Sequence, residues 1–238
     1  MSIDAVTFDL DGTLVDTAAE IAEAVNRTLV GLGLAPRPLA EITDLIGHGL
    51  HPLMVRLLQR LQTERPGLVG RLLADEVLPM LDRHYAATVG TQARPYPGVA
   101  EALDALIADG VRLGCVTNKE GRHARRVLEA CGLADRLALL IAGDTLPEKK
   151  PHASVLQQAA QRLGVTPDRL AHVGDSRTDI ESACNAGVAA WAVPYGYNGG
   201  EPIEAAHPQQ IFAGLAELAA HVIALRGKEN RSLSPCAD

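Results

Sequence analysis

Short apolar runs alternate with longer amphipathic stretches along most of the chain. The apolar runs cover residues 5–8, 112–117, 139–142, 170–173 and 189–193. Short runs without polar alternation are typical of strands that are covered on both faces, as in parallel sheets. We therefore predict that these runs are parallel strands.

Between the later runs, apolar residues recur at helical spacing. Such patterns follow Pro97-Gly98 and fill residues 122–131, 153–163 and 178–186. A glycine follows each of these last three ranges, as is common at helix C-termini. Repeating strand–helix units predict an α/β fold with a doubly wound, Rossmann-like parallel sheet.

About a hundred residues separate the first apolar run from the second. A crossover between parallel strands needs only about a dozen residues, so this segment predicts an inserted domain. Leucine, valine and alanine recur there at helical spacing, in residues 18–31, 51–61 and 68–89. We place an all-helical insert, a cap domain, at residues 16–92. The α/β core then comprises residues 1–15 and 93–227, and residues 228–238 form a flexible C-terminal tail.

Charge and composition exclude several classes of function. The net charge of −7 argues against a protein that binds nucleic acid through basic side chains. The four cysteines are widely spaced, which predicts neither a disulfide framework nor a zinc site and favours the reducing cytoplasm. Apolar stretches are too short to span a membrane. We expect a cytoplasmic protein without nucleic-acid or membrane partners, and both a monomer and a homodimer remain open.

Two carboxylates follow the first predicted strand. Asp9 and Asp11 are two residues apart, so in an extended strand their side chains point to the same side. Like charges this close require a cation or a shared proton. Gly12 permits a tight turn, and Thr13 offers a hydroxyl that can hold the turn or cap a helix. We expect the chemistry of the protein at this point.

Two further polar segments lie at the ends of predicted elements. Thr117 and Asn118 end the second strand, at the edge where doubly wound sheets bind ligands, although turn chemistry also explains them. Lys149 and Lys150 precede Pro151, which restricts them to an extended conformation. Lysine is scarce in this chain, and Lys119 and this pair all lie beside such polar segments.

A fourth polar segment follows the strand at residues 170–173. Asp175 and Asp179 are four residues apart and share one face if a helix begins early. Ser176 lies between them, and a helix cap with a first-turn acid would account for the same residues. These four segments occur in the order strand and Asp-x-Asp, Thr-Asn, Lys-Pro and Gly-Asp-x-x-x-Asp.

In that order, the segments resemble the four signatures of the haloacid dehalogenase-type phosphatases, a superfamily with an aspartate nucleophile. The resemblance implies that Asp9 attacks phosphorus to form an aspartyl-phosphate. It also implies that Asp11 protonates the leaving alcohol and then takes a proton from the hydrolytic water. Thr117, Asn118 and Lys150 are the implied phosphate-binding residues.

The same resemblance implies Mg²⁺ as the cofactor. Its ligands would be Asp9, Asp175 and the backbone carbonyl of Asp11, because hard cations prefer oxygen ligands. Asp179 and Ser176 would orient the metal site or Lys150. The superfamily also carries a helical cap after the first signature, as predicted here for residues 16–92.

Substrate choice is expected to depend on the insert. Gly47, His48 and Gly49 form a flexible segment that either reaches the closed site and sets specificity or merely connects helices. The Tyr195-Gly196-Tyr197 segment resembles the phosphoglycolate phosphatase branch, which implies hydrolysis of 2-phosphoglycolate to glycolate and phosphate.

Three alternatives remain beside this prediction. Within the superfamily, they are another sugar-phosphate phosphatase and a phosphosugar mutase, because no residue reveals the lifetime of the aspartyl-phosphate. A phospho-accepting signalling module also combines aspartates, Mg²⁺, a hydroxyl and a lysine on a doubly wound sheet. Its acceptor is expected on a middle strand without a large insert after the first one.

Overall fold

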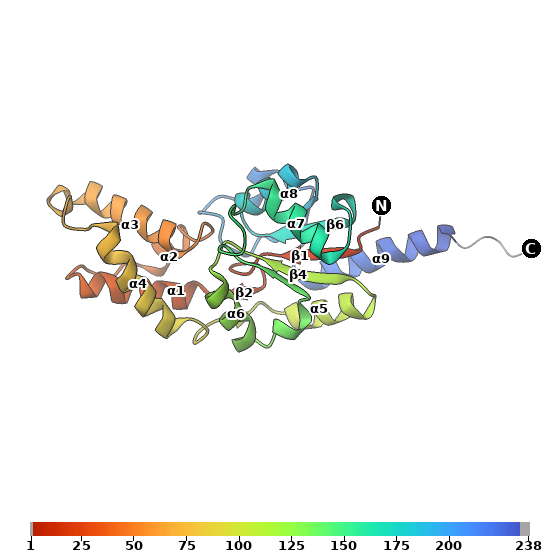
Figure 1. Ribbon diagram of the computed structural model, residues 1–238, viewed down its shortest axis with the longest axis horizontal. Coiled ribbons are helices and arrows are strands. Elements are labelled where there is room, and N and C mark those ends of the chain that lie inside the picture. The colour runs from red at the N-terminus through yellow and green to blue at the C-terminus, as the bar shows by residue number, and fades with distance from the viewer. Residues whose placement is uncertain (1, 234–238) are drawn as a thin grey trace, which may run out of the picture.

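The computed structural model describes residues 2–233, and it contains a six-stranded parallel sheet (Figure 1). The sheet order is β5-β4-β1-β6-β7-β8. The strands are β1 (Ala5–Phe8), β4 (Arg112–Val116), β5 (Leu139–Ile141), β6 (Leu170–Gly174), β7 (Ala189–Ala192) and β8 (Gln210–Ile211). The predicted α/β fold with a parallel sheet is confirmed. Strand β8 was not predicted, because two residues give no periodic pattern.

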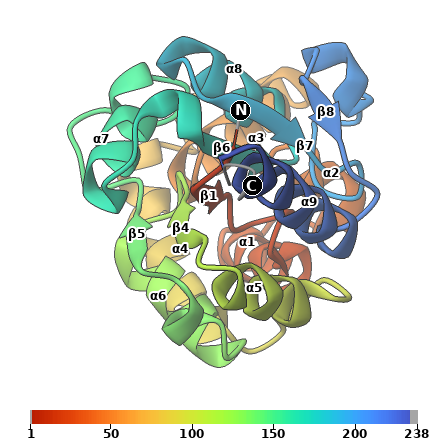
Figure 2. The same ribbon diagram turned by 90° about the vertical axis from the view of Figure 1, so that its right-hand side faces the viewer.

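Helices cover both faces of the sheet (Figure 2). One face carries α7 (Ala153–Leu163) and α8 (Arg177–Ala186). The other carries α5 (Val99–Ala108), α6 (Gly121–Ala130) and α9 (Leu215–Leu233). Strand β1 shows why its run is largely apolar, since Ala5 packs toward the first layer and Val6 and Phe8 toward the second.

A helical insertion lies beyond one end of the sheet, at the left of Figure 1. It consists of α1 (Ala18–Gly31), α2 (Leu39–Thr43), α3 (Leu50–Glu64), a 3₁₀ turn (Pro66–Leu68) and α4 (Ala74–Thr88). The helix expected over residues 68–89 starts later than predicted. Gly70 has a φ of +79°, which is incompatible with a right-handed helix and interrupts it.

Two short strands join the insertion to the core. Strand β2 (Val15–Asp16) pairs antiparallel with β3 (Arg94–Pro95), so the two segments that connect the core to the insertion lie side by side. The backbone N–H of Tyr96 also donates to the carbonyl of Leu14 at 3.1 Å. Strand β2 begins six residues after Asp9 in the sequence, so the insertion lies next to the carboxyl end of β1.

At the other end of the chain, α9 continues through Gly227 to Leu233. The helix therefore includes the first residues of the expected tail, since one glycine costs a helix only about 1 kcal/mol. Residues 234–238 lie outside the described part of the chain. Within residues 2–233, no helix combines the length and apolar character needed to cross a membrane.

Candidate active site

The carboxyl end of β1 leads into a tight turn that positions the first two aspartates. Asp9 continues the sheet, with its N–H donating to Val173 of β6 at 2.9 Å. Gly12 has a φ of +91°, and a Cβ atom there would lie 2.3 Å from the Asp175 carboxylate. The turn therefore requires a glycine at position 12 for two reasons, namely its backbone conformation and the close approach of Asp175.

Asp9, Lys150 and Asp179 form a buried cluster of charged side chains. The Lys150 Nζ atom is 2.9 Å from Asp9 Oδ1 and 2.6 Å from Asp179 Oδ1. Asp9 Oδ1 is buried, and the Lys150 ammonium is its charged neighbour. Burial raises the pKa of Asp9 to about 6, against the opposing effect of the Lys150 ammonium. Asp9 is therefore a buried carboxylate whose charge Lys150 compensates in part.

The position of Lys150 depends on Asn118. Their contact is reciprocal, because the Lys150 N–H donates to Asn118 Oδ1 at 3.0 Å and Asn118 Nδ2 donates to the Lys150 carbonyl at 3.1 Å. The same Nδ2 donates to the carbonyl of Gly47 in the insertion at 3.3 Å. Asn118 therefore connects the end of β4, the lysine and the cap segment.

Asp179 is oriented from the first turn of α8. Ser176 donates to Asp179 Oδ2 through its N–H at 3.1 Å, which is one half of a capping box, and through its hydroxyl at 2.6 Å. His172 Nε2 lies 3.4 Å from the other oxygen. Burial disfavours this carboxylate, but Lys150 and His172 outweigh burial and lower the pKa of Asp179 well below its usual value. Its oxygens are engaged, which suits the orienting role expected for Asp179 and Ser176.

Asp175 is held by the turn after β1 and by the segment after β7. The Thr13 hydroxyl donates to Asp175 Oδ1 at 2.7 Å, and the N–H of Tyr197 donates to Asp175 Oδ2. A Cβ atom on Gly196 would lie 2.3 Å from both the Asp175 Cβ and the Gly12 carbonyl. Burial, with Asp179 and Asp9 nearby, raises the pKa of Asp175 well above its usual range.

The donor set at this point fits a hard cation. Carboxylate oxygens of Asp9, Asp175 and Asp179 lie within 4.8 Å of one another, and all three residues are buried. Carboxylates gathered this closely repel each other unless a cation or a proton intervenes. Each Asp179 oxygen faces two donor groups, from Lys150, His172 and Ser176, whereas each Asp175 oxygen accepts one hydrogen bond. The carboxylates of Asp9 and Asp175 are therefore the more suitable ligands.

The Asp11 carboxylate points to different partners from those of Asp9. Its Oδ1 accepts a hydrogen bond from Thr17 Oγ1 at 2.6 Å and one from Lys119 Nζ at 2.8 Å. Lys119 is buried, and its ammonium lies 5.0 Å from the centre of the Tyr85 ring. Burial disfavours this ammonium, but Asp11 outweighs burial and raises the pKa of Lys119 above its usual value.

A cavity lies beside these aspartates, between the core and the insertion. Asp9, Asp11, Thr117 and Asn118 line it from the core, together with Lys119, Glu120 and His123. Gly47, Gly49, Leu50, Leu53, Ile21, Ile46 and Tyr85 line it from the insertion. The volume of the cavity is about 40 Å³, which is enough for about three waters.

Not every predicted residue faces this cavity. Gly47 and Gly49 do, but His48 lines a neighbouring cavity of about 290 Å³ with Arg56 and Asn198. Burial, followed by the charge of Arg56, lowers the pKa of His48. A role of His48 in specificity stays a prediction, and its side chain lies outside the cavity that contains Asp9 and Asp11.

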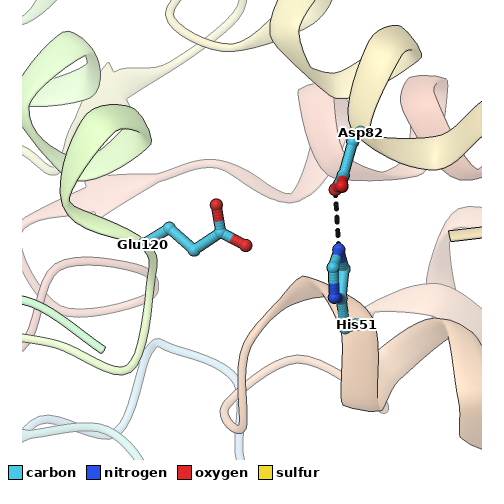
Figure 3. A group of neighbouring side chains, drawn as sticks. All are labelled: His51, Asp82 and Glu120. Carbon is cyan, nitrogen blue, oxygen red and sulfur yellow. Dashed lines mark hydrogen bonds and ion pairs between the residues drawn. The ribbon is translucent and has the colours of Figure 1, made fainter. Parts of the chain in front are cut away.

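Core and insertion also meet at the rim of this cavity. His51 of α3 is 2.7 Å from Asp82 of α4, and Glu120 of the core points toward this pair (Figure 3). Arg122 compensates part of the negative charge, with its Nε 2.9 Å from Glu120 Oε2. These charged groups connect the two parts of the chain where the cavity opens.

Sequence reasoning assigned no role to Lys119, Thr17 or Glu20. The scarcity of lysine was the one signal for Lys119, and an acid within the apolar pattern of α1 was the signal for Glu20. Glu20 is fully buried and accepts hydrogen bonds from the N–H groups of Gly90 at 2.8 Å and Ala93 at 3.1 Å. It thereby fastens α1 to the end of the insertion.

The tyrosines singled out in the sequence hold the base of the insertion. The Tyr197 hydroxyl accepts hydrogen bonds from the N–H groups of Thr17 at 3.0 Å and Ala18 at 3.1 Å. Tyr195 donates to the carbonyl of Thr13 at 2.9 Å. The glycine between them admits Asp175, so this segment joins the carboxylates to the start of α1.

Comparison with known proteins agrees with this site. A family profile described as haloacid dehalogenase-like hydrolase matches residues 6–193, and the chain belongs to this family. A protein of Nitrosospira multiformis named phosphoglycolate phosphatase is 40% identical over 203 residues, covering 85% of this chain and 88% of the relative. One of the same name from Thiobacillus denitrificans is 36% identical, covering 92% of this chain and 95% of the relative.

Solved structures show the same arrangement. A crystal structure described as a predicted phosphoglycolate phosphatase from Haemophilus somnus superposes with a TM-score of 0.83 at 31% identity. The match covers 93% of this chain and 98% of that chain. The fold, with its helical insertion, is therefore that of a hydrolase family with known structures.

Proposed function

We propose that this chain is a Mg²⁺-dependent phosphomonoesterase that hydrolyses 2-phosphoglycolate to glycolate and phosphate through an aspartyl-phosphate on Asp9. The observation that carries the proposal is the state of Asp9 Oδ1. This oxygen is buried and paired with the Lys150 ammonium at 2.9 Å, and its residue lines the cavity. A carboxylate oxygen in that state is suited to attack phosphorus.

Asp9 and Asp175 would hold Mg²⁺ through their carboxylates, and Asp11 through its backbone carbonyl. When bound, the ion supplies positive charge that stabilises the phosphoryl oxygens and orients them for attack. The gathering of buried carboxylates around Asp9 and the fixed orientation of Asp175 support this assignment.

In the first step, Asp9 attacks phosphorus and the bond to the alcohol oxygen breaks. Lys150 and the Thr117 hydroxyl stabilise the charge on the phosphoryl group, and Asn118 positions Lys150 through its backbone. Asp11 protonates the departing oxygen, so this carboxyl must carry a proton at that moment.

In the second step, water hydrolyses the aspartyl-phosphate. Asp11, now ionised, takes a proton from this water, and the Lys119 and Thr17 hydrogen bonds stabilise its negative charge. Phosphate leaves and the Asp9 carboxylate is restored. The Asp11 carboxyl thus serves both proton transfers while Asp9 acts as the nucleophile. This division agrees with their different partners, Thr17 and Lys119 for Asp11 and Lys150 for Asp9.

The names of the relatives support 2-phosphoglycolate as the substrate. The curated relatives from Nitrosospira multiformis and Thiobacillus denitrificans carry the name phosphoglycolate phosphatase. The phospho-accepting signalling module is not retained, because the chain belongs to a hydrolase family.

The proposal includes the division into a core, residues 1–15 and 93–227, and a cap, residues 16–92, that closes over the substrate. The pairing of β2 with β3 supports a hinge at the two connecting segments. The cytoplasm is the proposed compartment, since the described cysteines are all free.

The test is phosphate release from a panel of esters, namely 2-phosphoglycolate, glucose 1-phosphate, glucose 6-phosphate and p-nitrophenyl phosphate, with Mg²⁺ and with EDTA. We expect the highest kcat/KM for 2-phosphoglycolate and loss of turnover in EDTA. A higher kcat/KM for a hexose phosphate would contradict the substrate assignment. Conversion of glucose 1-phosphate to glucose 6-phosphate without phosphate release would indicate a mutase instead.

A further inference from the structure

One wall of the cavity carries a cation that the proposed mechanism uses only as the partner of Asp11. Lys119 is buried there, 2.8 Å from Asp11 Oδ1, whereas Lys150 lies with Asp9 and Asp179. The insertion contributes Tyr85 and a set of aliphatic side chains to this wall. An ammonium in such surroundings is poorly hydrated and attracts a further anion strongly.

His123 lines the same cavity. Only 6% of its side chain is exposed, and its Nε2 has no hydrogen-bond partner among the described residues, with Glu120 Oε2 lying 3.9 Å away. The ring packs edge-on against Tyr85 with centroids 4.8 Å apart. Burial, with Arg122 next, lowers the pKa of His123 to about 4, so the ring is neutral at neutral pH. A buried imidazole without a partner is costly, which points to a ligand that completes it.

The chemistry of the proposed substrate connects these two residues. In 2-phosphoglycolate, one methylene group separates the carboxylate from the ester oxygen that Asp11 protonates. The carboxylate must therefore lie beside the Asp11 side chain. Lys119 contacts that same side chain, so its ammonium is within reach of the carboxylate.

We propose that Lys119 and His123 bind the substrate carboxylate and thereby select phosphate esters with a carboxylate on the carbon next to the ester oxygen. This inference rests on the proposed function, which it deepens by naming the specificity site. The lysine supplies the charge, and the imidazole, protonated on Nε2, donates a hydrogen bond. The negative charges of Asp11 and Glu20 act on Lys119, and Glu120 lies 3.9 Å from His123 Nε2, so these acids limit the affinity for anions and favour release of glycolate.

The experiment compares 2-phosphoglycolate with ethyl phosphate, which has the same leaving oxygen on a methylene group but a methyl in place of the carboxylate. Lys119→Met keeps the length of the side chain and removes its charge. Loss of the Asp11 partner affects both esters, so the ethyl phosphate result measures that effect. We expect kcat/KM for 2-phosphoglycolate to fall a further factor of about 10 to 100 beyond the fall for ethyl phosphate, the effect of a lost charge-assisted hydrogen bond. Equal loss for both esters would overturn the proposal, because Lys119 would then act only through Asp11.

His123→Phe provides a second variant that preserves the packing against Tyr85. We expect KM to rise for 2-phosphoglycolate, and the inhibition constant of glycolate to rise with it, while KM for ethyl phosphate stays unchanged. An unchanged KM for 2-phosphoglycolate would overturn the role of His123. This variant remains informative if Lys119→Met fails to fold.

Lys149→Met serves as the matched control, because Lys149 is exposed. Its kinetics should equal those of the wild-type protein with both esters. Failure of the proposed function has a different signature, namely no phosphate release from either ester by the wild-type protein. Equal kcat/KM of the wild-type protein for both esters would leave a phosphatase and overturn the carboxylate site.

Discussion

Asn118 and Lys150 hold each other through two hydrogen bonds that use the backbone of the lysine and the side chain of the asparagine. The asparagine comes from the end of β4 and the lysine from the segment before α7, 32 residues later. Because the Lys150 ammonium lies between Asp9 and Asp179, this contact sets the position of a charge at the nucleophile.

Replacement of Asn118 should therefore impair turnover through Lys150. Asn118→Ala leaves the buried N–H of Lys150 without an acceptor, which costs about 1–3 kcal/mol, so we expect kcat/KM to fall about 10- to 100-fold. Asn185→Ala is the control, since Asn185 is exposed and donates a single bond to the carbonyl of Pro151. Equal kinetics of the two variants would contradict the positioning role.

Gly196 should be essential for metal affinity. A Cβ atom there would meet Asp175 and the Gly12 carbonyl at 2.3 Å, so Gly196→Ala must displace the carboxylate. We expect the Mg²⁺ concentration for half-maximal activity to rise about 10- to 100-fold, the usual effect of disturbing a group that orients a metal ligand. Gly67→Ala, with open space around its Cβ position, should leave that concentration unchanged. A Mg²⁺ dependence of Gly196→Ala like that of the control would argue against Asp175 as a ligand.

The pH profile should depend on Mg²⁺. Asp9 attacks phosphorus and binds metal only when ionised, and burial raises its pKa to about 6 in the absence of metal, so at limiting Mg²⁺ activity falls as the pH falls toward this value. A cation at Asp9 favours the carboxylate and lowers this pKa. Measured from about pH 5 to about pH 8, the acid limb of kcat/KM should move to lower pH as Mg²⁺ increases. An acid limb that is independent of Mg²⁺ would indicate that another group controls it.

His48 provides a test of the cap segment. As a specificity residue, His48→Ala should raise KM for 2-phosphoglycolate more than KM for p-nitrophenyl phosphate. Since its neighbours Gly47 and Gly49 line the cavity and His48 lines the adjacent one, we expect a smaller effect than that of His123→Phe. Equal effects on both substrates would restrict His48 to a structural role in the loop.

Local patterns predicted the sheet and the helical insertion well. Apolar runs identify strands β1, β4, β5, β6 and β7, because buried parallel strands need apolar residues on both faces. Sequence reasoning also selected Asp9, Lys150 and Asp175, since each follows or precedes a clear strand or proline signal. The structure brings these three residues together, as the carboxyl ends of neighbouring strands meet at one edge of the sheet.

Contacts between distant positions were not predictable in the same way. Nothing near Lys119 indicates that its ammonium meets Asp11, 108 residues earlier, because that distance depends on the turn after β1 and on the end of β4 together. Similarly, the sequence suggested Asn118 as a phosphate ligand, whereas its side-chain bonds to Lys150 depend on the path of the segment before Pro151. His123 lies in a helix whose pattern resembles that of any amphipathic surface helix.

Covalent participation of Asp9 is the central claim, and chemical trapping tests it most directly. Borohydride reduces an aspartyl-phosphate to homoserine, which peptide mass spectrometry locates in the chain. With 2-phosphoglycolate and Mg²⁺, the Asp11→Asn variant, in which hydrolysis of the intermediate is slowed, should yield homoserine at position 9. The Asp9→Asn variant should yield none and release no phosphate. Phosphate release by Asp9→Asn at a rate near that of the wild-type protein would contradict the account.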